Sequence, residues 1–173
     1  MTRKRMLQVA MIVACAVTSV PALSAQDGEP SYSLDGAWFG WATIEGLQPF
    51  PFMDIYSSDS GNPGRSGPVL CTLSTGVIPG PVGPLVSGTQ SAHGNWIRVA
   101  KNKFAFTAWK ILLNEAGQPV GMAKFWGSVT AKASDTFTGT VNAAFYYGQS
   151  ESAFATFKGT TVSHRIMVEL EAQ

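Results

Sequence analysis

Residues 103–148 read KFAFTAWKILLNEAGQPVGMAKFWGSVTAKASDTFTGTVNAAFYYG, three apolar runs separated by two short polar segments. The runs are rich in Val, Ile, Thr, Phe, Tyr and Trp, which is the composition of β-strands. Because side chains alternate between the two faces of a strand, each tight turn fixes which residues face one another. Turns at 115–118 and 133–135 predict the pairs Phe104–Val129, Phe106–Gly127, Ala108–Phe125, Val129–Gly139, Gly127–Val141 and Ala123–Phe145.

These pairs place one apolar set on one face, and large residues tend to meet small ones, as the curved interior of a small barrel requires. A two-residue turn at Lys101-Asn102 extends the pattern to the preceding strand, with Val99 opposite Phe104 and Ile97 opposite Phe106. The other face collects mainly polar residues, namely Lys124, Ser128, Thr130, Lys132, Thr136, Thr138, Thr140 and Asn142.

Strand signals continue along the rest of the chain, and no window after the first 25 residues shows a helical repeat. We expect strands near 36–45, 51–56, 68–75, 94–100, 103–114, 119–132, 136–148 and 153–170. Eight strands in hairpin order predict an all-β fold, an eight-stranded antiparallel up-and-down β-barrel. A β-sandwich is the alternative.

Residues 1–25 have the pattern of a secretory signal peptide. A basic start (Arg3, Lys4, Arg5) precedes an apolar stretch over 6–20, and small residues before Gln26 offer a cleavage site. The apolar stretch is shorter than the roughly 20 residues of a membrane-spanning helix. We therefore expect a periplasmic or secreted protein without a stable membrane anchor. A retained anchor is one alternative, and a lipoprotein attached at Cys15 is another.

Cleavage would leave a flexible leader at 26–33 and a single domain at 34–173. It removes three of the 12 basic residues and none of the 11 acidic ones, so the net charge becomes −2. No basic cluster suggests a nucleic-acid partner. Cleavage would also remove Cys15 and leave Cys71 as the one cysteine of the mature chain, which excludes an internal disulfide. The hydrophobic core must then stabilise the fold without one.

The connections of a meander alternate between its two ends, and the longest at one end covers 76–93. Its segment 77–85 is apolar and rich in proline, which favours a lid over a cavity. The register continued toward this end puts Lys110 opposite Ala123 and His93, and Tyr147 opposite Gly121. The sequence therefore predicts ligand-binding residues at the mouth and in the apolar interior below it, namely His93, Lys110, Tyr147, Phe106, Phe125 and Phe145.

A second interpretation gives these mouth residues no function. Lysine can extend its amine to water while its stem covers apolar surface, His93 can cap a strand and Tyr147 can sit at the rim. If the group does converge, a partly desolvated Lys110 would have a lowered pKa, which suits proton abstraction or pairing with a carboxylate ligand.

Other chemistry-bearing residues give weaker signals. His93, His164 and Cys71 lack the spacing of a metal site, and no motif indicates a cofactor. Cys71 alternates with Val69 and Leu73, which favours a buried, inert thiol over a nucleophile. Asp54 interrupts an apolar run, and we expect it at a strand edge or on the outer face rather than inside.

Two likenesses add to this interpretation. Gly36-Ala37-Trp38 resembles the Gly-x-Trp motif of lipocalins and related calycin barrels, in which the Trp lies at the closed end under an Arg, a role that Arg165 would fill here by a cation–π contact. A second lipocalin motif and a C-terminal helix are absent from the sequence pattern.

The chain is more similar to uncharacterised bacterial secreted proteins with lipocalin-like or allene-oxide-cyclase-like barrels. The resemblance covers about 34–165 and rests on His93-Gly94-Asn95-Trp96, Phe104-Ala105-Phe106-Thr107, Asn114-Glu115-Ala116-Gly117 with Gly121, and Asp135-Thr136-Phe137-Thr138-Gly139-Thr140. It implies a fold and export but no activity, because barrels of this shape include carriers and cofactor-free cyclases.

The sequence thus favours an exported protein that holds a small apolar or amphipathic molecule inside the barrel. The alternative is a cofactor-free isomerase, cyclase or lyase that uses Lys110, Tyr147 and His93 on a small hydrophobic substrate at the barrel mouth. A third hypothesis is an interaction module or homo-oligomer that associates through an outer aromatic spot of Trp109 and Trp126. Whether the protein is an enzyme, and what its ligand is, cannot be decided from the sequence.

Overall fold

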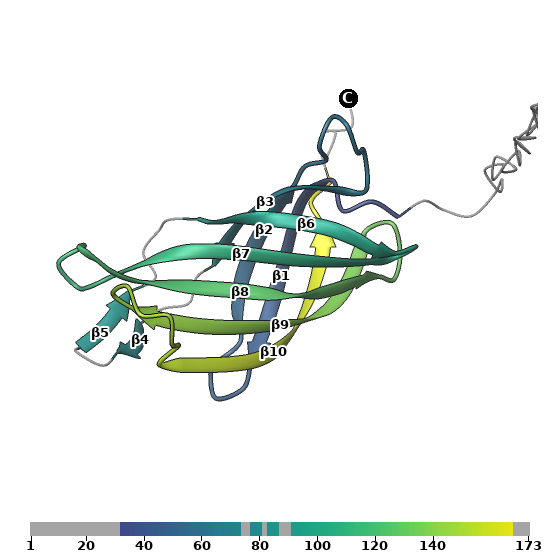
Figure 1. Ribbon diagram of the computed structural model, residues 1–173. Helices are drawn as coiled ribbons and strands as arrows, with labels where there is room; N and C mark the ends of the chain where they lie inside the picture. The colour runs from purple at the N-terminus through teal and green to yellow at the C-terminus, as the bar shows by residue number, and fades with distance from the viewer. Residues whose placement is uncertain (1–31, 74–76, 81–82, 87–90, 168–173) are drawn as a thin grey trace, which may run out of the picture.

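The computed structural model describes residues 32–73, 77–80, 83–86 and 91–167, and they form a closed antiparallel β-barrel (Figure 1). The expected signal peptide and most of the leader lie outside these residues. Eight strands form the barrel wall: β1 (Gly36–Ile44), β2 (Phe50–Tyr56), β3 (Ser66–Leu73), β6 (Ala92–Ala100), β7 (Lys103–Leu113), β8 (Pro119–Ala131), β9 (Thr136–Tyr147) and β10 (Ala155–Arg165).

Each wall strand pairs with its neighbour in the chain, and β1 pairs with β10 to close the cylinder. The up-and-down barrel is confirmed and the sandwich alternative is wrong. The expected long connection at 76–93 contains a short hairpin, β4 (Val77–Gly80) and β5 (Gly83–Val86). The hairpin joins the barrel through the pair Val86–Leu113, at the end where β7 turns into β8. Residues 74–76, 81–82 and 87–90 of this connection lie outside the described residues. Its role as a lid over the cavity therefore stays a prediction.

The predicted register of β7, β8 and β9 is confirmed. Every expected pair across β7–β8 and β8–β9 occurs, from Phe104–Val129 at one end to Gly121–Tyr147 at the other. Opposite Val129 stands Gly139, where an added Cβ would come within 2.7 Å of the valine Cγ1 and 2.3 Å of the Ser128 carbonyl oxygen. Glycine at this position lets the two strands bring a large residue inward without a clash.

The predicted register of β6 is wrong by one residue. The structure pairs Trp96 with Phe106 and Arg98 with Phe104, and an irregularity between Arg98 and Ala100 shifts the strand. A β-bulge inserts one unpaired residue and so exchanges the two faces of the strand beyond it. Trp96 is therefore buried, whereas Ile97 and Val99, expected inside, are about half exposed.

Two arginines link separate segments of the chain at the end of the barrel that has the short β6–β7 and β8–β9 turns. Arg165 lies over the Trp38 ring, with its Cζ 4.3 Å from the centroid, as the lipocalin resemblance implied. Its guanidinium also donates to the carbonyl oxygens of Ser33, Asp35 and Ser134. Arg98 donates to the Gly64 and Tyr32 carbonyl oxygens. Tyr32 and Ser33, the last residues of the expected leader, are thus held against this end.

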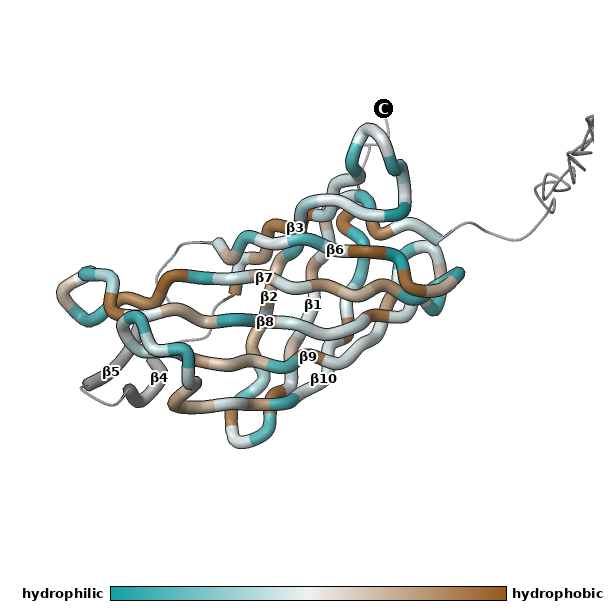
Figure 2. Tube along the Cα trace, in the orientation of Figure 1, coloured by the Kyte–Doolittle hydropathy of each residue, from teal (hydrophilic) through white to brown (hydrophobic). Residues whose placement is uncertain are grey.

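Along the backbone trace, turns include many hydrophilic residues, while many strand positions are hydrophobic (Figure 2). The predicted outward orientation of Trp109 and Trp126 is confirmed, and the Lys124 ammonium lies 5.4 Å from the centroid of each ring. β10 ends at Arg165, short of the expected residue 170. Within the described residues, no helix is long and apolar enough to cross a membrane.

Candidate ligand-binding site

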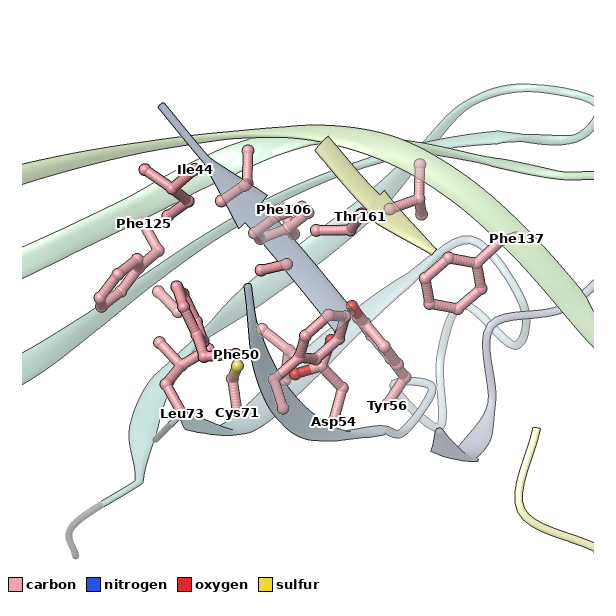
Figure 3. Close-up of a pocket in the computed structure, with 16 residues that line it drawn as sticks. Ile44, Phe50, Asp54, Tyr56, Cys71, Leu73, Phe106, Phe125, Phe137 and Thr161 are labelled. Carbon is pink, nitrogen blue, oxygen red and sulfur yellow. Dashed lines mark hydrogen bonds between the residues drawn. The ribbon is translucent and has the colours of Figure 1, made fainter. Parts of the chain in front are cut away.

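The barrel encloses a narrow cavity of about 40 Å³ (Figure 3). Seven of the eight wall strands contribute to it, all except β6, and most lining side chains are apolar. The lining residues are Ala42, Ile44, Phe50, Phe52, Asp54, Tyr56, Val69, Cys71, Leu73, Phe106, Ala108, Phe125, Val129, Phe137, Val141 and Thr161. Such an apolar space with a few polar groups has the composition of a small-molecule site.

Asp54 is the most unusual group in this lining. It follows Phe50 and Phe52 in the inward phase of β2, and only 6% of its surface is exposed. The Tyr56 hydroxyl donates a 2.8 Å hydrogen bond to its Oδ2, whereas Oδ1 has no hydrogen-bond partner among the described residues. The expectation that Asp54 lies at an edge or outside is wrong, because the alternation of β2 is unbroken through this residue.

Burial is the main influence on the charge of Asp54. It raises the pKa of the carboxyl from 3.8 to about 6, because the charged form loses its hydration. The neighbouring Cys71 and Tyr56 act in the opposite direction, since both can donate hydrogen bonds to the ionised carboxylate. At neutral pH the group is therefore mostly ionised, although it is poorly solvated.

Cys71 lies directly across from Asp54 in the β2–β3 pairing. Its inward orientation, predicted from the alternation with Val69 and Leu73, is confirmed by its place in the cavity wall. Burial raises the pKa of the thiol well above its usual range, the Asp54 charge adds to the increase, and the Lys110 charge opposes it. A protonated thiol is a weak nucleophile, which supports a structural role for this cysteine.

Two hydroxyl groups of β10 complete the polar side of the interior. Thr161 lines the cavity and Ser163 lies on the same inner face, and neither hydroxyl oxygen has a hydrogen-bond partner among the described residues. Ser163 packs against Gly40, where a Cβ would approach the serine Oγ to 2.4 Å. Glycine at residue 40 thus gives the serine side chain room to point inward.

The three predicted phenylalanines all point into the barrel, but they do not share one role. Phe106 and Phe125 line the cavity. Phe145 lies outside its lining and packs edge-on against Phe125, with ring centroids 6.3 Å apart, so it supports that ring. Phe145 also packs edge-on against Phe157 of β10, with ring centroids 5.6 Å apart. The inward orientation of this set is confirmed, and contact with a ligand remains a prediction.

Lys110 points inward, as predicted, and the side chain is almost fully buried. Its Nζ reaches across the inner face of β6 and donates a 3.3 Å hydrogen bond to the Leu73 carbonyl oxygen at the end of β3. Burial lowers the pKa of the amine. Lys110 does not line the cavity; it links β7 to the end of β3 above it.

Tyr147 and His93 do not join Lys110 in one site. Tyr147 faces Gly121, as predicted, and is half-buried against the core. His93 pairs with Trp109 and is exposed on the outer face, so its predicted place at the inner mouth is wrong. The cause is the bulge in β6, which reverses the inward and outward positions of that strand.

Sequence reasoning missed Asp54, Tyr56 and Thr161. A usable signal was present, because Phe50, Phe52, Asp54 and Tyr56 have the same parity and the aromatic members must face the core. Strict alternation alone therefore places the carboxyl inside. The usual preference of carboxylates for water outweighed that signal.

No protein-family model matches the chain, and no curated protein matches it. Solved structures do match in fold. The structure described as EF1p2_mFAP2b bound to DFHBI is 16% identical, with a TM-score of 0.50 over 78% of this chain and 94% of the other. A redesigned β-barrel, b11L5F_LGL, is 12% identical, with a TM-score of 0.46 over 78% of this chain and 92% of the other. The first likeness shows a shared β-barrel fold.

Proposed function

We propose that this protein binds a small apolar or amphipathic molecule inside its barrel. The cavity lining carries the proposal: aromatic and aliphatic side chains surround a single buried carboxyl with an unpartnered oxygen. A core that served only stability would gain nothing from a carboxylate at this position, because burying one without full hydrogen bonding is costly. The matching barrel EF1p2_mFAP2b is bound to DFHBI, so a barrel of this fold can hold a small molecule.

The size of the cavity limits what enters without rearrangement. A volume of about 40 Å³ exceeds the roughly 10–15 Å³ that one water needs, yet it holds only a few non-hydrogen atoms. A larger ligand requires lining side chains to move. Phe106 lines the cavity and is less buried than Phe125, so it is the residue that we choose to enlarge the cavity.

The place of action is part of the proposal. The basic start, the apolar stretch and the small residues before Gln26 support export to the periplasm or the outside of the cell. A binding protein there would meet its ligand outside the cytoplasm. The enzyme alternative built on Lys110, Tyr147 and His93 is not proposed, because His93 is on the opposite face from the other two.

The test uses two matched alanines on β7. Ala108 lines the cavity, whereas Ala105 faces outward on the same strand. Ala108→Leu fills the cavity and should weaken the binding of benzene, followed by NMR shifts, at least about tenfold. Ala105→Leu adds the same atoms outside and should leave binding unchanged. Thermal unfolding of both variants shows whether the barrel remains folded.

A second variant covers the case in which Ala108→Leu does not fold. Phe106→Ala enlarges the cavity and should strengthen the binding of N-phenyl-1-naphthylamine, a neutral apolar dye followed by fluorescence. If neither probe binds saturably to the wild type or to Phe106→Ala, the proposed function is wrong.

A further inference from the structure

One buried oxygen in the cavity wall can act only as a hydrogen-bond acceptor. Among the described residues, the buried side-chain atoms without a partner are Asp54 Oδ1 and the hydroxyl oxygens of Thr161 and Ser163. Asp54 and Thr161 line the cavity from β2 and β10. A hydroxyl can donate or accept, whereas a carboxylate oxygen can only accept, so a bound molecule satisfies Asp54 Oδ1 by donating.

The charge of the wall points to a cation rather than a neutral donor. The described groups that act on the Asp54 carboxyl are Tyr56 on β2 and Cys71 on β3, both uncharged in their usual forms. On β1, Asp54 faces Trp38, whose Nε1 already donates a 2.7 Å hydrogen bond to the Leu34 carbonyl oxygen. The buried amine of Lys110 on β7 acts on Cys71 and donates to Leu73.

The cost of desolvation also favours a cation. Removing a carboxylate from water is expensive, and in this protein folding has already removed it. An incoming ammonium group has to lose only its own hydration, and it gains a charge-assisted hydrogen bond, which is roughly twice as strong as a neutral one. A neutral hydroxyl group would form a weaker hydrogen bond with the same carboxylate oxygen.

We propose that the ligand is a small amphipathic amine whose ammonium group donates to Asp54 Oδ1 while its apolar part packs against the aromatic lining. This inference rests on the proposed function and names the ligand class of the same cavity. Thr161 supplies a second acceptor in the wall. From Asp54 the apolar part extends along the cavity toward Ile44, Leu73 and Phe125 (Figure 3).

Binding should depend on pH in a definite direction. An alkylamine stays protonated up to about the lysine value of 10.4, and Asp54 is ionised above about pH 6. Amine affinity should therefore be highest between these two values and fall as the pH drops through 6. The affinity of a neutral alcohol should change little over that range.

The experiment compares butylamine, 1-butanol and butyrate, three probes with similar apolar parts and different head groups. With the purified protein near pH 7, NMR titration should give butylamine a Kd at least about tenfold below that of 1-butanol, a difference of ~1.4 kcal/mol. Butyrate should bind most weakly, because its charge repels Asp54. Asp54→Asn keeps the shape of the side chain and should abolish the preference for the amine.

Glu115→Gln provides a control matched in charge, because it also removes one carboxylate but from an exposed turn outside the cavity lining. The amine preference should persist in this variant. An amine that binds no more tightly than the alcohol, or a preference that survives in Asp54→Asn, would overturn this inference. If benzene still binds in that case, the proposed function stands. If benzene and all three butyl probes fail to bind, both are wrong.

Discussion

The two sides of the barrel interior differ in the chemistry of their side chains. The apolar wall, the inner faces of β7, β8 and β9, pairs large residues with glycine and alanine, and its polar side chains, Lys110 and Tyr147, lie outside the cavity lining. The polar wall, the inner faces of β1, β2, β3 and β10, carries Asp54, Tyr56, Cys71, Thr161 and Ser163. One wall supplies shape and stability, and the other supplies the groups that can orient a ligand.

The largest effect should come from removing volume from the apolar wall. Phe104 is fully buried and packs against Trp96, with ring centroids 5.8 Å apart. Phe104→Ala should lower the free energy of unfolding by about 3–5 kcal/mol, as measured by urea denaturation. Ile97→Ala on the neighbouring strand should cost less than about 1 kcal/mol, because this side chain is 52% exposed. Equal losses in the two variants would contradict the assigned register of β6.

The buried Asp54 carboxyl of the polar wall should lower the free energy of unfolding at neutral pH, whereas the side chains of the apolar wall raise it. The pKa of Asp54 is raised from 3.8 to about 6 in the folded protein, so the fold favours the protonated acid. This favourable contribution is fully present below pH 3.8 and is lost as the pH rises to 6. The rise in pKa corresponds to about 3 kcal/mol.

The pH dependence of the unfolding free energy can be compared between the wild type and Asp54→Asn. The other carboxyl groups contribute equally to both proteins, so the difference isolates the contribution of Asp54. Between pH 3.5 and 7, the unfolding free energy of the variant should gain about 3 kcal/mol relative to the wild type. Urea denaturation at several pH values measures the difference. A constant difference across this range would mean that the carboxyl is solvated.

Lys110 should have a smaller effect, because it lies above the cavity rather than in its wall. Lys110→Met keeps the apolar stem and removes the hydrogen bond to Leu73, so about 1 kcal/mol of stability should be lost. Benzene affinity should stay within twofold of the wild type. A large loss of affinity would show that the amine contacts the ligand, as the sequence suggested.

The smallest effect is expected at the outer aromatic spot. Trp109 is 39% exposed and lies beside Lys124, so Trp109→Ala should change stability by no more than about 1 kcal/mol. Analytical ultracentrifugation of the wild type and this variant tests the hypothesis of a homo-oligomer. Association that persists in the variant would exclude Trp109 as the contact.

The comparison of the two walls also explains what the sequence could predict. The apolar wall was predictable because short turns fix its register and its inward residues are apolar or small, apart from Lys110 and Tyr147. The β6 strand was mispredicted because Ile97 and Val99 are as apolar as Trp96, so hydrophobicity alone did not reveal the bulge. Asp54 was missed because the usual preference of carboxylates for water outweighed the unbroken alternation of β2, which places the residue inside.

The most direct test of the account is the ¹³C NMR titration of the Asp54 side-chain carboxyl in the purified protein, with and without saturating butylamine. The predicted midpoint is about 6 in the free protein, and it should move to lower pH when the ammonium group binds. A midpoint near 3.8 in the free protein that does not respond to the amine would contradict a buried carboxyl that serves as the ligand's anchor.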